Sequence, residues 1–250
     1  MDKMIFTVLN GMKVTEQRQA NTFNELANVN TVGFKKSFSS AVISRDLIAQ
    51  GHLNSRAFPM LQTDNIVDLS PGSVQRTGHP LDLYVSGQGL FAVQAPDGTE
   101  AYTRRGDIKI TENGVLTTGA GHLLLGDNGP ITLPPSAKVD IAADGTVNIL
   151  AAGEAGNVMT PVARIKLVNA QDQVMQIRSD GLFQTANKAL LQADADITVM
   201  TGAVEGSSAS PIDAMVQMIR DSREYEMQVS VFKNAKELST AGASVVRMDG

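Results

Sequence analysis

Cysteine and tryptophan are absent from the sequence, and aromatic residues make up only 4% of its 250 residues. Without cysteine the chain has no disulfide, no thiolate nucleophile and no cysteine-based metal site. The scarcity of aromatic residues predicts a core packed mainly with aliphatic side chains. The net charge is −5 and the isoelectric point is near 5.2, which excludes the basic field of a nucleic-acid-binding protein.

Long hydrophobic runs are also lacking. No run approaches the roughly 20 apolar residues that a membrane span requires. The apolar run that starts at Met4 ends by Gly11, and no basic segment precedes it as in a secretory signal peptide. We therefore expect a soluble chain without direct membrane insertion. It should not be exported through a cleaved signal, and another export route stays open.

The first feature that is present is a helical pattern over residues 4–36. Its residues recur at steps of four and three, which keeps them on one side of an α-helix. We expect a helix from residue 4 to about residue 28, ending where Asn28, Asn30 and Gly33 supply left-handed conformations. The N-terminal stripe of this helix consists of Ile5, Leu9, Met12, Glu16, Gln19, Phe23 and Leu26.

A second helical stripe lies near the end of the chain, at the 3.5-residue spacing of a coiled-coil seam. Ser210 and Pro211 make a good helix start, because Ser can cap a helix and Pro is tolerated in its first turn. We expect a helix over residues 211–238 and a frayed end over residues 239–250. This C-terminal stripe consists of Met215, Met218, Ser222, Tyr225, Val229 and Phe232.

Neither stripe belongs by periodicity to the sequence between them. We therefore expect the two terminal helices to pack on each other and on other chains. The alternative is an internal antiparallel helix pair with no outside partner, an arrangement that is common beside β domains.

Between the helical ends the sequence consists of short β-type runs separated by turns. Residues 37–77 have a weak pattern and are expected to form an extended connector. Five pairs can take the positive-φ positions of a type I′ turn: Asp97-Gly98, Asn113-Gly114, Asn128-Gly129, Asp144-Gly145 and Asp180-Gly181. The candidate strands are 81–85, 87–93, 101–103, 108–110, 115–118, 122–125, 139–141, 147–150, 162–168, 174–178 and 197–200. This pattern predicts an all-β body, either a barrel or a sandwich.

No pattern predicts a catalytic, cofactor-binding or metal site. His52, His79 and His122 lie far apart in the sequence without a paired Asp or Glu, so we expect structural or surface roles. The segment 87–89 has two glycines, but a nucleotide loop needs a third and a following helix. The Asp-Gly pairs are not part of a calcium-binding series, and turn chemistry explains them.

Two pairs of neighbouring basic residues fall short of a basic patch. Lys35 and Lys36 are expected to lie just beyond the end of the first helix, where positive charge is mildly favourable. Arg104 and Arg105 are expected to be solvated or to form a local ion pair.

Five short motifs follow one another along the chain. Residues 24–35 have the sequence N-E-L-A-N-V-N-T-V-G-F-K, and residues 78–91 contain G-H-P-L-D-L and G-Q-G-L-F. Residues 102–116 contain Y-T-R-R-G and G-V-L, residues 202–207 are G-A-V-E-G-S, and residues 215–226 run from M-V-Q-M-I to R-E-Y-E. In this order they resemble the flagellar basal-body rod and hook protein family. Glu25 and residues 208–210 depart from the family pattern. The length and the weak C-terminal leucine content are similar to those of its proximal rod members.

The resemblance implies a structural, non-enzymatic subunit without a cofactor. It implies discontinuous domains, with residues 1–36 and 205–250 in a helical coiled coil and residues 78–204 in a β domain. It also implies export through the flagellar type III apparatus and polymerisation in the periplasm, with other rod subunits and copies of itself, as part of a drive shaft. The expected assembly interface comprises Leu9, Met12, Phe23, Leu26, Asn28, Asn30, Met215, Met218, Tyr225, Val229 and Phe232.

Two other classes of function are weighed against this one. A secreted β-domain binding or adhesive module with folded-back helices would need clustered exposed aromatics, and the eight Phe and three Tyr lie mostly in apolar contexts. A hydrolase would need a carboxylate pair within reach in the folded body, which the sequence does not exclude.

Overall fold

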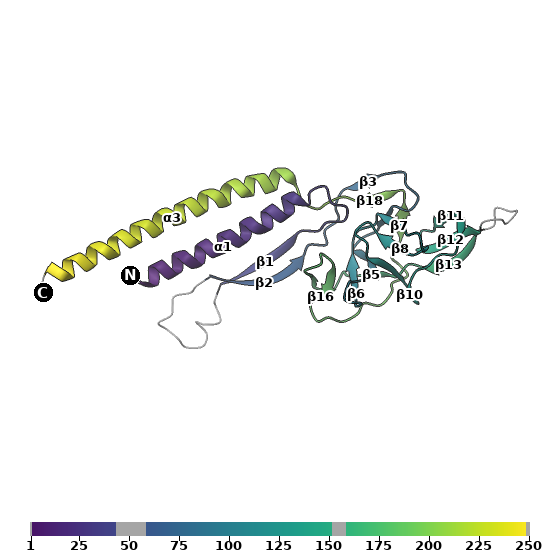
Figure 1. Cartoon of the computed structure of the whole chain (residues 1–250), viewed down its shortest axis with the longest axis horizontal. Coiled ribbons are helices and arrows are strands. Elements are labelled where there is room, and N and C mark those ends of the chain that lie inside the picture. Colours follow the sequence, from purple (N-terminus) through teal and green to yellow (C-terminus); the bar gives the residue numbers. More distant parts are fainter. Residues whose placement is uncertain (1, 44–58, 152–158, 249–250) are drawn as a thin grey trace. The chain divides into compact units, whose positions relative to one another are not determined.

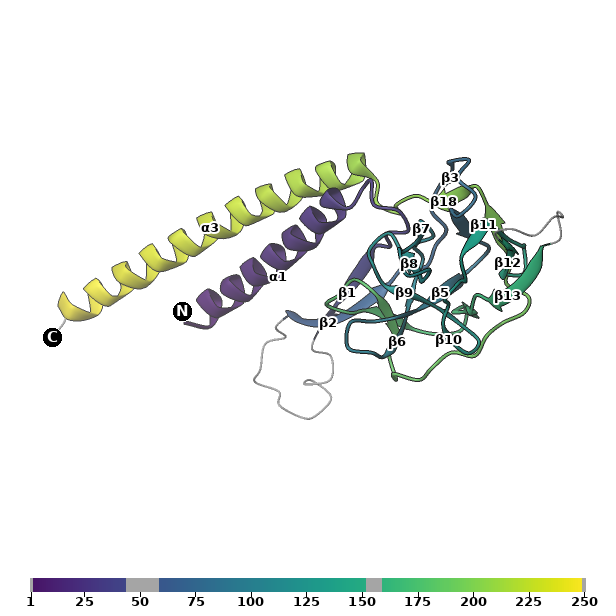
Figure 2. The ribbon, with the colours of Figure 1, turned by 45° about the vertical axis from the view of Figure 1, so that its right-hand side comes forward.

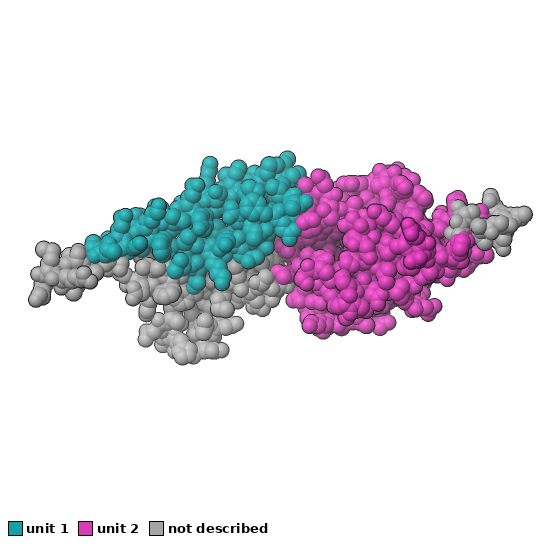
Figure 3. Space-filling model, viewed as in Figure 1, with its two compact units in different colours: residues 1–27, 39–64, 210–250 teal, residues 28–38, 65–209 magenta. Residues whose placement is uncertain are grey.

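The chain divides into two compact units in a computed structural model that describes residues 2–43, 59–151 and 159–248. One unit contains residues 1–27, 39–64 and 210–250, and the other contains residues 28–38 and 65–209 (Figure 3). The first unit therefore holds both terminal helices, and the second holds most of the strands.

Two long antiparallel helices, α1 (Asp2–Ala27) and α3 (Pro211–Met248), lie side by side in the first unit (Figures 1 and 2). Helix α1 agrees with its predicted range. Helix α3 begins as predicted, because the Ser210 hydroxyl oxygen accepts a hydrogen bond from the Asp213 N–H at 3.3 Å. The predicted fraying of residues 239–248 is wrong, since alanines and the lack of proline favour helix there.

Glycine alone provides the left-handed residue after α1. Gly33 has a φ of +66°, whereas Asn28 and Asn30 do not have positive φ. The Asn28 carbonyl instead accepts a hydrogen bond from the Thr31 N–H at 3.1 Å. The left-handed role expected of the two asparagines is therefore wrong.

The described strands confirm a mainly β body between the terminal helices. They are β1 (Ser37–Ile43), β2 (Pro59–Val67), β3 (Val74–Arg76), β4 (Leu83–Val85), β5 (Gly89–Gln94), β6 (Glu100–Thr103), β7 (Ile108–Ile110), β8 (Leu116–Thr118), β9 (Leu123–Gly126), β10 (Gly129–Pro130), β11 (Ser136–Ile141), β12 (Thr146–Ala151), β13 (Thr160–Arg164), β14 (Leu167–Asn169), β15 (Met175–Ile177), β16 (Phe183–Thr185), β17 (Val199–Thr201) and β18 (Ala203–Glu205). The range expected to be an extended connector thus contains β1, β2 and β3.

The strands form open sheets. An 11-stranded sheet has the main order β1-β2-β15-β16-β6-β5-β9-β8-β7, with β10 beside β9 and β14 beside β5. Strands β11, β12 and β13 form a three-stranded antiparallel sheet, and β17-β4 and β18-β3 are two-stranded. Within the described part of the chain β7 does not pair with β1, so the barrel alternative finds no support.

The Asp-Gly turns belong to a different type from the one predicted. A type I′ turn needs positive φ at both central residues, but in Asp97-Gly98, Asp144-Gly145 and Asp180-Gly181 only the glycine has it. In the first turn the Gly98 N–H donates to the Ala95 carbonyl and the Ala95 N–H donates to the Thr99 carbonyl, each at 2.9 Å. This is a three-residue loop in which glycine forms a bulge. The Asp side chain accepts from the N–H two residues later, at 3.0 Å from Thr99 and 3.1 Å from Leu182.

Two segments differ from the predicted strands. The predicted strand 162–168 is split into β13 and β14, because the chain passes from one sheet to another between them. The Ile165 N–H donates to the Gly145 carbonyl and the Lys166 N–H donates to the Leu125 carbonyl, both at 2.9 Å. Strand β18 lies between the last predicted strand and the second helix, where the sequence pattern predicts no strand, and it pairs with β3.

The core of the body is mainly aliphatic, as the composition predicts. One cluster centres on residues such as Leu83, Val93 and Leu116, each 0% exposed. A second cluster contains Leu90, Val168 and Met175 together with the aromatic rings of Tyr102 and Phe183.

Candidate assembly surfaces

The contact between α1 and α3 is polar. Thr15 and Asp221 are 0% exposed although both are hydrophilic. The Arg18 guanidinium donates to a Glu224 carboxylate oxygen at 2.6 Å, and the Gln228 amide donates to the Thr15 hydroxyl oxygen at 3.0 Å. These pairs define the seam, the contact line between the two helices, and they fix its antiparallel register.

The seam is also incompletely bonded. Asp221 Oδ1 accepts from the Gln217 amide at 2.9 Å, but Asp221 Oδ2 and Arg18 Nε are buried without a hydrogen-bond partner among the described residues. Small residues, Ala214 and Ala235, fill two other buried positions of α3. A contact made of small residues and of polar groups that are only partly hydrogen-bonded contributes little stability compared with an apolar coiled-coil seam.

Both predicted stripes lie one residue after the seam. Phe23 follows the buried Thr22, and Tyr225 and Val229 follow the seam residues Glu224 and Gln228. Neighbouring residues of an α-helix point about 100° apart. The stripes therefore turn away from the facing helix, and they are not what pairs α1 with α3.

Each stripe is offset from the seam by one residue toward the C-terminus of its helix. Because the helices are antiparallel, this offset places both stripes on the same side of the helix pair. The seam places Gly11 near Gln228, where a Cβ on the glycine would lie 3.6 Å from the glutamine amide nitrogen. Moving one residue along each helix places Met12 opposite Val229 and, two turns further along α1, Gln19 opposite Ser222. The combined surface, here called the stripe face, is apolar toward its two ends and polar in its middle.

Much of the stripe face is open to solvent. Leu9 is 44% exposed, Phe23 49%, Met215 48% and Tyr225 41%. The other predicted interface residues are half-buried, apart from the exposed Asn30; these are Met12, Leu26, Asn28, Met218, Val229 and Phe232.

Sequence reasoning missed a second apolar area on α3. Ile212, Val216 and Ile219 are 70%, 42% and 55% exposed. Their spacing of four and three residues places them on the side of α3 that faces away from the seam. The same spacing rule that found the two stripes would have found this group.

Sequence reasoning also missed a buried ion cluster in the body, made of Lys35, Arg104 and Glu205. Each side chain is about 1% exposed. The Lys35 ammonium donates to Glu205 Oε1 at 2.6 Å, and Arg104 Nε donates to Glu205 Oε2. The expectation of a solvated or locally paired Arg104 is wrong. Arg105 does form the expected local pair, with Asp107 at 2.7 Å.

Backbone groups complete the bonding of the ion cluster. Arg104 donates to the Gly87 carbonyl at 2.6 Å and also to the Gly89 carbonyl, while Lys35 donates to the Ser70 carbonyl at 2.5 Å. The Gly72 N–H donates to Glu205 Oε1 at 2.5 Å. Burial by itself raises the pKa of Glu205, but the Arg104 charge and the Lys35 hydrogen bond outweigh it and hold the pKa below its usual value. The carboxylate is therefore ionised at neutral pH.

The ion cluster joins segments that are far apart in the chain. Lys35 ends the first motif singled out in the sequence, Arg104 lies in the third, and Glu205 lies in the fourth. Nearby, the Gly33 N–H donates to the Glu205 carbonyl at 2.7 Å and the Ser208 N–H donates to the Phe34 carbonyl at 3.0 Å. The two ends of the body are thus held to its middle by charge and by backbone pairing.

Other candidate chemistry is sparse. His79 is exposed and His122 half-buried, and His52 lies outside the described residues. Within residues 2–43, 59–151 and 159–248, no three His, Asp or Glu side chains gather as a metal site would require. In the same ranges no helix is both long and apolar enough to cross a membrane.

Comparison with known proteins matches two parts of the chain to family models. Residues 84–149 match the D1 domain of the flagellar hook protein FlgE/F/G family, and residues 200–245 match the C-terminal domain of the flagellar basal body rod FlgEFG proteins. The ion-cluster residues Arg104 and Glu205 each lie within one of these matches.

Whole-chain relatives agree with the domain matches. The chain is 38% identical to the flagellar basal-body rod protein FlgF of Salmonella typhimurium and 36% identical to that of Escherichia coli, covering 95% of each chain. It is 28% identical to the flagellar basal-body rod protein FlgG of Bacillus subtilis, over 95% of this chain and 97% of that protein. The resemblance seen in the five motifs is confirmed.

Proposed function

Because this chain belongs to the family of flagellar basal-body rod and hook proteins, we propose that it is a structural subunit of the basal-body rod. The relatives that carry this name match almost the whole chain. They support a structural rather than an enzymatic role, located at the flagellar basal body, and they favour it over the adhesive module and the hydrolase.

The proposal for how subunits join is based on the stripe face. The helices pair through a polar seam that does not use the apolar side chains of the stripe face, so these side chains remain for a partner. Burying the exposed part of Leu9, Phe23, Met215 or Tyr225 would contribute roughly 1 kcal/mol each. Asn28 and Asn30, just after α1, extend this interface.

Growth of a rod needs contacts between different surfaces, because a patch paired with itself closes a dimer. In our proposal the stripe face of one subunit packs on another surface of a neighbouring copy or of another rod subunit. The 3.5-residue spacing of both stripes suits a coiled coil between subunits. Residues 1–36 and 205–250 then act as one helical domain in the assembly, with residues 37–77 as connector and residues 78–204 as β domain. In the single chain residues 28–36 and 205–209 group with the body.

The rest of the proposal follows from the family. The subunit is exported by the flagellar export apparatus without a cleaved signal, is assembled in the periplasm, and belongs to the proximal rod. The five motifs and the similarity to FlgF proteins support this placement.

The variant Phe232→Asp tests the stripe face. An ionised carboxylate buried at an assembly contact without a partner costs several kcal/mol, so we expect no rods in electron micrographs of flagellar bases and no motility. The body should still fold, as judged by its urea unfolding, and the subunit should still be exported. Asn234→Asp is the matched control, because it adds the same charge at an exposed position of the same helix. Normal rods with Phe232→Asp would refute the proposal.

A further inference from the structure

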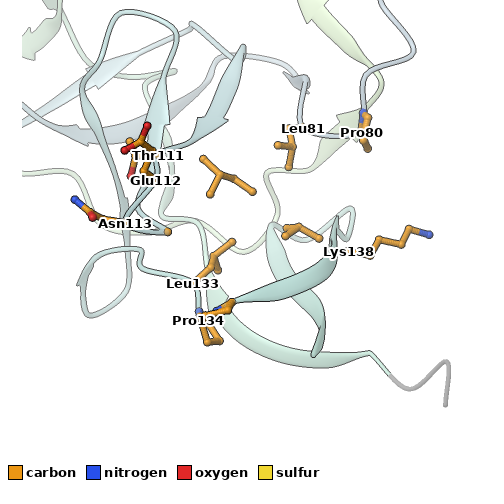
Figure 4. A pocket seen from close by; sticks show the side chains of 12 residues that line it. Pro80, Leu81, Thr111, Glu112, Asn113, Leu133, Pro134 and Lys138 are labelled. Atoms are coloured by element: carbon orange, nitrogen blue, oxygen red, sulfur yellow. The ribbon is translucent and has the colours of Figure 1, made fainter. Parts of the chain in front are cut away.

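The body has an open cavity of about 560 Å³ between two sheets. Strand β7 ends the 11-stranded sheet and contributes Ile110, while β11 ends the three-stranded sheet and contributes Val139. Figure 4 shows Leu81 and Leu133 pointing into the same space, with Pro134 at its border. The lining is therefore mainly apolar.

The same body carries a loop, residues 186–190, all of which are exposed. Its last residue, Leu190, is 62% exposed, more than any other large apolar residue of the body among those described. The loop follows β16 and precedes Leu191, whose N–H donates to the Tyr102 hydroxyl oxygen at 2.7 Å. An apolar side chain in this position lies in water unless a partner covers it.

Hydrogen bonds hold the loop in one conformation. The Thr185 hydroxyl donates to the Ala189 carbonyl at 2.7 Å, the Lys188 N–H donates to the Thr185 carbonyl at 2.9 Å, and the Ala189 N–H donates to an Asn187 side-chain oxygen at 3.1 Å. A loop that is already ordered loses little conformational entropy when it docks.

The loop cannot fill the cavity of its own chain. In the main sheet order β16 and β7 are separated by β6, β5, β9 and β8, which at the usual strand spacing is roughly 24 Å. An exposed loop and a cavity at different places on one molecule can make a contact between copies that need not close.

We propose that the loop 186–190 of one copy docks in the cavity of a second copy, with Leu190 inserted among the apolar side chains. Glu112 and Lys138 line opposite sides of the cavity (Figure 4), and Lys188 is exposed beside Leu190. Docking with Lys188 on the side of Glu112 pairs opposite charges and keeps Lys188 away from Lys138. The proposal rests on the rod function above, because it takes another copy of the chain as partner. It adds a contact between bodies to the contact between helices.

The absence of cysteine makes a cross-linking test direct. Full-length Leu190→Cys and Pro134→Cys chains are mixed at concentrations where the wild-type chain self-associates, and disulfide formation is followed on non-reducing gels. Both positions are exposed, so the fold is preserved. We expect the mixed dimer in several-fold excess over the mixed dimer from Val174→Cys and Pro134→Cys. Val174 is 54% exposed and serves as the matched control.

Charge exchange gives the second measurement. Lys188→Glu in the Leu190→Cys chain should lower the yield of mixed dimer, and Glu112→Lys in the Pro134→Cys chain should restore it. If the wild-type chain self-associates and Phe232→Asp abolishes this, but the Leu190 yield does not exceed the Val174 control, the docking contact is wrong and the rod function stands. If the wild-type chain does not self-associate at all, self-polymerisation and the docking contact fail together.

Discussion

Gly33 lies closer to the backbone of Arg104 than any side chain would allow. A Cβ at Gly33 would be 2.6 Å from the carbonyl carbon and oxygen of Arg104, and the φ of Gly33 is +66°. Both the space and the backbone conformation therefore require glycine here. This contact holds the turn that leads to Lys35 and the ion cluster.

Gly33→Ala should destabilise the body by about 2 to 4 kcal/mol, the sum of backbone strain and overpacking. Gly78→Ala is the control, because Gly78 has a similar φ of +74° but nothing within 4 Å of an added Cβ. It should cost only about 1 kcal/mol. Urea unfolding of both variants measures the difference. Equal losses would show that the approach to Arg104 does not constrain the fold.

Glu205→Gln should be among the most destabilising single changes in the body. It removes the carboxylate that Lys35 and Arg104 share, leaving two buried cations, and breaking a buried pair in this way costs about 3 to 5 kcal/mol. Asp97→Asn removes one of the two carboxylates that pair with Arg178, in a pair whose Asp side chain is 52% exposed, and it should destabilise the body much less. A Glu205→Gln protein as stable as the Asp97→Asn protein would contradict the importance of the ion cluster.

The pH dependence of stability offers an independent test. The pKa of Glu205 in the folded chain is lowered from 4.5, so its contribution to stability is complete above that value. It is lost as pH falls through the lower folded pKa, because the folded state must then take up a proton that disrupts the cluster. We expect the urea midpoint of the wild-type chain to drop more steeply than that of Glu205→Gln below about pH 4.5. Parallel curves for the two proteins would rule this out.

Limited proteolysis of the monomer should separate the body from the helices. The polar seam leaves α1 and α3 weakly paired, and isolated helices are marginal in water. The terminal stripes alone predict a resistant core from residue 37 to about residue 201. The structure moves both boundaries, to about Asn28 and about Ala209, because Lys35 and Glu205 of the ion cluster belong to the body. Mass spectrometry of the fragments gives the boundary, and helices that resist protease as firmly as the body would disprove weak pairing.

The terminal helices show what periodicity can and cannot reveal. Their existence, their extent at the N-terminus and their apolar stripes follow from spacing alone. The face that pairs within the chain does not, because Thr15, Arg18 and Asp221 give no apolar signal. A periodicity analysis detects large apolar residues such as Phe23 and Tyr225, which lie one position after the seam residues.

The ion cluster shows a second limit. Its three residues all lie within motifs that the sequence singled out, yet their pairing depends on how β3, β6 and β18 are arranged in space. A charged residue read in its local sequence suggests solvent or a near neighbour, as Arg105 and Asp107 confirm. Only the folded topology shows that Arg104 and Glu205 meet. The positions of turns are easier to predict, because glycine marks them locally. The type of turn is harder to predict, because it depends on strand register.

The separation between the members of the ion cluster also sets an order in time. During synthesis from the N-terminus, Lys35 is made early and Arg104 later. Both cations remain without their shared carboxylate until Glu205 has been made. Until then the body holds two positive charges that cannot be buried. The native charge balance is therefore reached late, just before helix α3 begins.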